Sequence, residues 1–170
     1  MNRRRRDARA LAAAAAALAV LAALGLAAAG AVADTPPAYP QGAESFQSNC
    51  AVCHGPAGAG LPSLAPPLLS YPARYAASAE GRRQLAITVL YGMYGDVVVE
   101  GKHYSFQMPA FGQLDDASLA AVLNFVVFDL AHAPASVAPL TTAEIAAERA
   151  HPLDAAAVRE HRKSVAPEEP

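Results

Sequence analysis

The strongest constraint on this chain is a pentapeptide in its first third, Cys50-Ala51-Val52-Cys53-His54, which contains both cysteines of the 170 residues. Two thiols three positions apart can bond to the two vinyl groups of one haem. A histidine directly after the second thiol can then ligate the iron through its imidazole. The motif therefore predicts one covalently attached haem c, with Cys50 and Cys53 as the thioether positions and His54 as an axial ligand.

Two other interpretations of paired cysteines are weaker. A redox-active dithiol is expected in a strand–helix–strand context, and a zinc site needs more ligands than two cysteines provide. The N-terminal sequence indicates export, and in an oxidising compartment two free thiols this close would pair as a strained disulfide. Covalent haem explains the motif better than either.

The first 33 residues have the layout of an export signal. Five arginines stand among the first nine residues. The uncharged run 10–33 follows, with 15 Ala, 5 Leu, 2 Val and 2 Gly, and ends in Ala31-Val32-Ala33. This order predicts a secretory signal peptide cleaved after Ala33. A run of 24 uncharged residues could also remain as a membrane anchor. In both cases we expect the rest of the chain in the bacterial periplasm.

The remaining chain is acidic. Residues 34–170 hold 8 basic and 14 acidic residues, a formal net charge of -6. Affinity for nucleic acid comes from clustered Lys and Arg, so no nucleic-acid partner is expected. An isolated basic segment, 74–83, could face an acidic patch on a protein partner, but we interpret it as a solvated loop and helix start.

Composition divides the exported part into three segments. Residues 34–41 form a Pro-rich leader, 42–130 hold both cysteines and nearly all aromatic residues, and 131–170 are rich in Ala, Pro and charge. The middle segment is the predicted functional domain. In the C-terminal extension, Thr141 and Asp154 can cap two short helices, which either pack across the domain or serve for docking.

Helical patterns dominate the middle segment. We predict helices at 42–49, at 79–91 with Ser78 as N-cap, and from Asp115 to about 130. Between them lie two long loops with Gly and Pro, residues 55–77 and 92–113. Loops of that length are uncommon in a compact domain unless they wrap a ligand. We therefore expect an all-α fold with few helices and long loops around one haem.

Residues 42–130 resemble the class I cytochromes c, and the likeness extends beyond the haem motif. Gly42 and Phe46 precede Cys50 at four-residue steps, as in the N-terminal helix of that family. There the glycine permits a close crossing by the last helix, and the aromatic ring packs into it. On the last helix, Val122, Phe125 and Val126 resemble the face that packs against the N-terminal helix in that family.

The resemblance also implies contacts to the haem and its ligand. Pro66-Pro67-Leu68 resembles a family segment in which a proline carbonyl accepts a hydrogen bond from the axial histidine, with Pro66 as the better candidate and Pro67 one register away. Residues 91–104 are similar to a loop across the haem front in small bacterial cytochromes c associated with dehydrogenases or terminal oxidases. This similarity implies a propionate contact for Tyr104.

The sixth iron ligand has three candidates, Met93, His103 and Met108. The segment Met108-Pro109-Ala110-Phe111 resembles the methionine loop of the family. Proline at 109 favours an extended backbone at the residue before it. We therefore predict Met108 as the axial ligand, with Met93 and His103 in structural roles.

The ligand set predicts the function. With His54 and Met108 both bound, the iron has no free position for substrate or oxygen, which suits one-electron transfer. We expect an electron carrier, or the cytochrome subunit of a dehydrogenase or oxidase system, with catalysis in the redox partner. A methionine ligand and an apolar wrap raise the reduction potential. The wrap predicted here consists of Phe106, Phe111, Leu119 and Leu123. The alternative is a haem enzyme or gas sensor with an open or gated sixth position.

Overall fold

The computed structural model describes residues 36–105 and 107–165. The predicted signal peptide or anchor at 1–33 lies outside these residues, as do the first two positions of the predicted leader and Phe106. Within the described part, no helix is long and apolar enough to cross a membrane.

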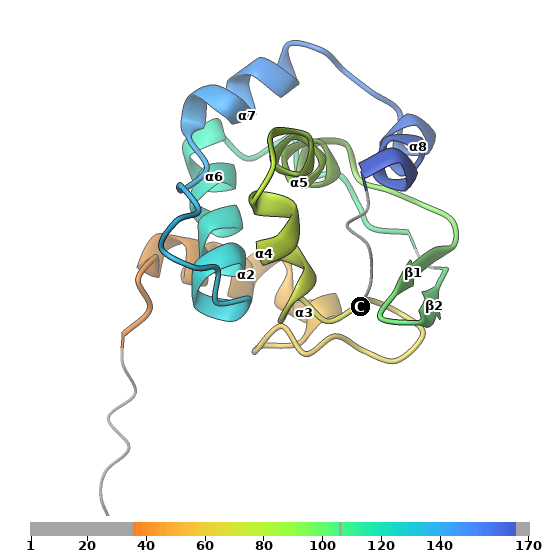
Figure 1. Cartoon of the computed structure of the whole chain (residues 1–170), viewed down its shortest axis with the longest axis horizontal. Coiled ribbons are helices and arrows are strands. Elements are labelled where there is room, and N and C mark those ends of the chain that lie inside the picture. Colours follow the sequence, from red (N-terminus) through yellow and green to blue (C-terminus); the bar gives the residue numbers. More distant parts are fainter. Residues whose placement is uncertain (1–35, 106, 166–170) are drawn as a thin grey trace, which may run out of the picture. The chain divides into compact units, whose positions relative to one another are not determined.

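The described chain is mostly helical, with one small hairpin (Figure 1). The helices are α2 (Pro40–Asn49), α3 (Ala51–His54), α4 (Tyr71–Ala76), α5 (Ala79–Tyr91), α6 (Asp116–Asn124), the π-helical segment η1 (Phe125–Leu130), α7 (Thr142–Arg149) and α8 (Ala155–Val165). The strands are β1 (Val97–Val99) and β2 (Lys102–Tyr104). The expected fold of few helices and long connections is confirmed, with the hairpin as an addition.

Side-chain caps set where the longer helices begin. Ser78 accepts a hydrogen bond from the amide of Gly81 at the start of α5, and Asp115 accepts one from Ser118 at the start of α6. Thr141 and Glu144 form a complete capping box at the start of α7. Each cap satisfies backbone N–H groups that have no partner within the helix, so these boundaries are encoded locally.

Helices α2 and α6 cross at very short range. A Cβ atom added at Gly42 would lie 2.1 Å from the carbonyl oxygen of Ala121, so only glycine permits this approach. One turn later Phe46 is fully buried, and its ring centroid lies 5.4 Å from that of Phe125. Leu68, Val122 and Val126 complete the cluster around these rings. The crossing brings the end of α2, and with it the haem motif, against the last helix of the domain.

The last helix of the domain does not stay α-helical throughout. From Phe125 to Leu130 it is a π-helix, and at its end the amide of Ala131 donates to the carbonyl of Val126, five residues earlier. Phe125 and Val126 pack in the cluster around Phe46. Val127, the next residue, packs in a second cluster with α5 and α7.

The C-terminal extension packs across the domain, which was one of the two roles predicted for it. Helices α7 and α8 both lie against α5 (Figure 1), and Ile145 of α7 is fully buried in the second cluster. The guanidinium of Arg82 donates to both carboxylate oxygens of Glu144 and to the carbonyls of Ala138 and Pro139. The basic segment 74–83 was expected to be solvated. For Arg82 that expectation is wrong, because the extension covers it and leaves its side chain 16% exposed.

The two predicted loops contain regular structure that the sequence pattern did not reveal. Helix α4 lies within the first loop. In the second, β1 and β2 pair antiparallel with Val98 opposite His103. Glu100 and Gly101 between them have positive φ angles of 51° and 69°, as a tight hairpin turn requires. The strands have only three residues each, which is too short for an alternating pattern to stand out.

Candidate haem-binding site

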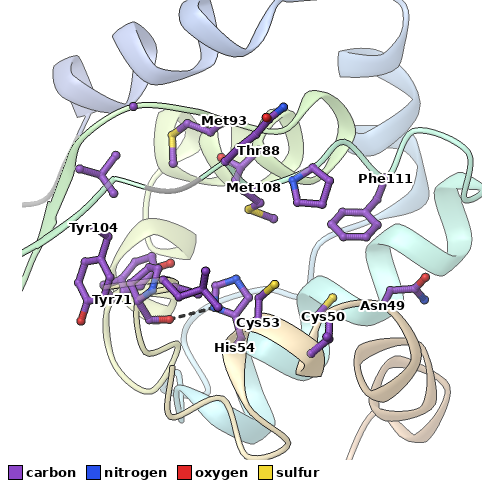
Figure 2. A pocket seen from close by; sticks show the side chains of 18 residues that line it. Asn49, Cys50, Cys53, His54, Tyr71, Thr88, Met93, Tyr104, Met108 and Phe111 are labelled. Atoms are coloured by element: carbon purple, nitrogen blue, oxygen red, sulfur yellow. Dashed lines mark hydrogen bonds between the residues drawn. The ribbon is translucent and has the colours of Figure 1, made fainter. Parts of the chain in front are cut away.

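A cavity of about 860 Å³, counting the part open to solvent, lies between the haem motif and the segment around Met108 (Figure 2). Its wall is mainly apolar, from residues such as Val52, Leu64, Ala65, Val97 and Phe111. The site is therefore suited to a large apolar group with a few polar contacts.

The haem motif forms one side of this cavity. The amides of Cys53 and His54 both donate to the carbonyl of Cys50, so the motif is one helical turn. This turn lets both sulfur atoms face the cavity (Figure 2). Burial, and next the neighbouring Cys53, raise the pKa of the Cys50 thiol to about 11. Redox-active dithiols instead have lowered thiol pKa values, so this environment argues against a thioredoxin-like pair.

His54 is buried and held in a defined orientation. Its Nδ1 lies 2.9 Å from the carbonyl oxygen of Pro66. A carbonyl can only accept, so Nδ1 carries the proton and Nε2 keeps its lone pair for a metal ion. Burial lowers the pKa of His54, although the hydrogen bond to Pro66 acts in the opposite direction. The result is a neutral imidazole, the form that ligates iron.

A tight turn brings Pro66, and not Pro67, to this position. The amide of Gly60 donates to the carbonyl of His54 at 2.8 Å, and the amide of Leu68 donates to Gly58 at 2.7 Å. Gly60 has a φ angle of 74°, and a Cβ atom there would lie 2.6 Å from the nitrogen of Pro67. The loop can therefore fold back under the histidine only with glycine at this point.

Two methionines stand on the other side of the cavity. Met93 and Met108 are paired by backbone hydrogen bonds in both directions, 2.8 and 3.0 Å long, and both line the cavity. In Figure 2 the Met108 sulfur points into the cavity toward the side that holds Cys53 and His54. Met93 also lines a second, smaller cavity together with Gln84 and Leu85 of α5. The structure therefore brings Met108 opposite His54.

The other sequence-predicted residues divide between the cavity and the surface. Tyr104 is buried and lines the cavity. His103 does not line it. Its ring is exposed, and its Nδ1 lies 2.9 Å from a carboxylate oxygen of Asp96.

Two of the residues predicted for the apolar wrap can be placed at the site. Phe111 lines the main cavity, and Leu123 lines a smaller adjacent one together with Cys50. Leu119 belongs instead to the core between α5, α6 and α7, and it lines neither cavity. Its predicted role in the wrap is therefore wrong. Leu119 shares a face of α6 with Leu123, but it lies one helical turn earlier, where core side chains and not the cavity surround it.

Sequence reasoning missed Tyr71 and Thr88, which also line the cavity. Burial raises the pKa of Tyr71 to about 12, and the Arg162 guanidinium, 5.7 Å from its ring centroid, acts in the opposite direction. Tyr71 lies in the loop assigned no structure, and its aromatic character was the one available signal. Thr88 lines the cavity from the C-terminal half of α5, and the amphipathic pattern did not distinguish it from its neighbours.

The arrangement fits haem c and not the competing metal site. Two thiols and an imidazole lie on one side of an apolar cavity, and a thioether lies on the other. Haem proteins use this set of groups for covalent attachment and axial ligation. Among the residues that the structure describes, no group of three or more His, Cys, Asp or Glu side chains could hold a metal ion, as a zinc site would need.

Comparison with known proteins finds a matching family model and two similar proteins. A family model described as cytochrome C oxidase, cbb3-type, subunit III matches residues 37–126, slightly more than half of the chain. Two proteins from Thermus thermophilus, both named cytochrome c-552, are 35% identical to this chain over 120 residues. The match covers 69% of this chain and 92% and 81% of the two relatives.

Proposed function

The chain belongs to the class I cytochromes c, with covalent haem c and haem-based electron transfer, and we propose that His54 and Met108 hold the haem iron between them. The observation that carries this proposal is the direction of the Met108 sulfur, which enters the cavity opposite the buried ring of His54 (Figure 2).

Each residue at the site has a distinct part in this proposal. Cys50 and Cys53 form the two thioethers, and His54 presents Nε2 because the Pro66 carbonyl holds Nδ1–H. Tyr104 lines the same cavity and is proposed to contact a propionate. Bound haem c supplies an iron centre that gains and loses one electron.

The surroundings support a carrier with a raised reduction potential. Methionine is a poor donor to oxidised iron, and an apolar wall disfavours the additional charge of the oxidised state. Phe111 and Val97 contribute to that wall. Two protein ligands also leave no open position for substrate, so catalysis is assigned to the redox partner.

We place this electron transfer in the bacterial periplasm, with residues 1–33 as a signal peptide or as a membrane anchor. The redox partner is proposed to be a dehydrogenase or a terminal oxidase. The family description, which names an oxidase subunit, favours the oxidase. Co-purification of the chain with its partner from native membranes and periplasm tests this assignment.

The ligation is tested by the variant Met108→Ala. If the thioether occupies the sixth position, the oxidised variant loses the far-red sulfur-to-iron charge-transfer band, and the reduced variant binds carbon monoxide readily. Attachment through Cys50 and Cys53 stays intact. Met93→Ala and His103→Ala serve as controls and keep the spectrum of the parent. Rapid and complete carbon monoxide binding by the parent, or an open-site spectrum in Met93→Ala, would overturn the assignment.

A further inference from the structure

Arg149, in the last turn of α7, joins the C-terminal extension to the loop that carries Met108. This loop, residues 107–115 before α6, is called the methionine loop below. Its Nη1 donates to the carbonyl of Gly112 at 2.6 Å, and its Nη2 donates to the carbonyl of Leu114 at 2.7 Å. Its Nε donates to a carboxylate oxygen of Asp116, the first residue of α6, at 2.7 Å. One guanidinium therefore fixes the end of the methionine loop and the start of α6 together.

The other end of this loop is fixed separately. Met108 pairs with Met93 through two backbone hydrogen bonds, and the amide of Phe111 donates to the carbonyl of Val89 on α5. Backbone carbonyls that lose a protein partner must find water. Arg149 supplies such a partner to Gly112 and Leu114. Its contacts therefore favour the position that the loop has in this structure, with Met108 facing the cavity, which is called closed below.

The geometry and partial burial of these contacts indicate that they stabilise the closed position of the methionine loop. Arg149 and Asp116 have side chains that are only 34% and 24% exposed. The planar guanidinium presents several N–H groups in a fixed fork, which suits three acceptors at once better than an ammonium group would. Hydrogen bonds from a charged donor are also about twice as strong as neutral ones.

Helix α7 is anchored independently of the methionine loop. Arg83 of α5 pairs with Glu148 at 3.2 Å, and the hydroxyl of Tyr91 donates to the Glu148 carbonyl at 2.7 Å. Arg149 is the next residue, so its backbone is held to α5 by contacts that do not involve the loop. The position of Arg149 is therefore set by α5, and its side chain can hold the methionine loop in place.

We infer that Arg149 is a positioning residue for the Met108 ligand, and that the C-terminal extension holds the methionine loop closed. This inference rests on the proposed axial role of Met108. Arg149 lies beyond residues 37–126, the segment that the family model matches, so this function belongs to the extension. An added ligand can replace Met108 only if the loop opens, and opening breaks the contacts to Arg149.

The test is a titration of the oxidised, haem-loaded full chain with imidazole, followed by the shift of the main haem absorption band, which every variant has. In the variants that keep Met108, loss of the far-red band is followed as well. Arg149→Ala lowers the cost of opening, so the apparent affinity for imidazole should rise about tenfold, which corresponds to about 1.4 kcal/mol. Arg149→Lys keeps the charge beside Asp116 but not the fork. It should raise the affinity by a smaller factor, and it provides a second variant if the alanine variant does not fold.

Two further variants separate this role from general stability. Arg83→Ala breaks the pair with Glu148 between the same two helices without touching the loop. It should lower the thermal midpoint but leave imidazole affinity within about twofold of the parent, because the Tyr91 hydrogen bond and the buried side chain of Ile145 still hold α7 against α5. In Met108→Ala, imidazole has no competitor, so adding Arg149→Ala should change nothing more.

The outcomes distinguish the two proposals. If Met108→Ala binds imidazole far more tightly than the parent while both Arg149 variants match the parent, the positioning role is overturned and the axial assignment stands. An equal gain from Arg83→Ala would also overturn it, because the effect would then come from loosening α7. If Met108→Ala binds imidazole like the parent, the axial assignment itself fails, and the role of Arg149 fails with it.

Discussion

Replacing Gly42 with alanine tests the helix crossing on which the haem motif depends. The new Cβ atom would lie 2.1 Å from the Ala121 carbonyl oxygen and 2.8 Å from Cβ of Phe125. That carbonyl cannot turn away, since it accepts the amide of Phe125 within the helix. To restore normal contact distances, α2 and α6 must separate by roughly 1 Å, which also loosens the buried ring of Phe46.

Gly42→Ala is informative because the close crossing decides whether it raises or lowers the free energy of unfolding. On an unobstructed helix, glycine to alanine stabilises the fold by about 1 kcal/mol. Overpacking costs about 1–3 kcal/mol and sometimes more, and a fixed backbone contact places Gly42→Ala at the upper end. We therefore expect a net loss of about 2 kcal/mol in the free energy of unfolding.

Thermal unfolding of the haem-loaded chain, followed by far-ultraviolet circular dichroism, measures this loss. A protein of this size loses roughly 3–4 °C per kcal/mol, so the midpoint of Gly42→Ala should fall by about 7 °C. Glu44→Ala, at an exposed position of the same helix, should change the stability by less than about 0.5 kcal/mol. A midpoint for Gly42→Ala at or above that of the parent would refute the close crossing.

Two further predictions concern the extension and the cofactor. Hydrogen bonds from Arg82 lower the pKa of Glu144 to about 2, below its ordinary value of 4.5, so the pair stabilises the fold above pH 4.5 and loses this effect as the pH falls toward 2. The difference in thermal midpoint between the parent and Glu144→Gln should therefore shrink over that range, and a constant difference would contradict the role of the charge. The cavity wall also lacks a packing partner without the haem, so the double variant Cys50→Ala, Cys53→Ala should yield no stable protein after export. A well-dispersed NMR spectrum from the haem-free variant would disprove this dependence.

Features encoded by neighbouring residues could be predicted from the sequence. The haem motif is contiguous, and the caps at Ser78, Asp115 and Thr141 act within three residues, so each leaves a local pattern. Even the tight crossing at Gly42 was predictable by resemblance, because glycine and aromatic spacing is characteristic of this family.

Features that depend on distant contacts could not be predicted. Arg82 and Glu144 are 62 positions apart, and nothing near either residue indicates the pairing. The choice between Pro66 and Pro67 depends on how the preceding glycine turn closes, which adjacent identical residues cannot reveal. Thr88 faces the cavity because of how α5 packs against the helices around it, most of which are distant in the sequence.

The π-helical segment after α6 makes the length of the last helix as important as its composition. Because its hydrogen bonds span five residues instead of four, each residue advances the helix by a smaller rotation than in an α-helix. Within this segment Phe125 and Val126 pack beside Phe46, and the next residue, Val127, packs in the cluster that holds Ile145. Deleting one residue between 125 and 130 would restore the α-helical phase and turn one of these contacts away from its cluster. Relatives that keep both clusters should therefore vary in the side chains of this segment but not in its residue count.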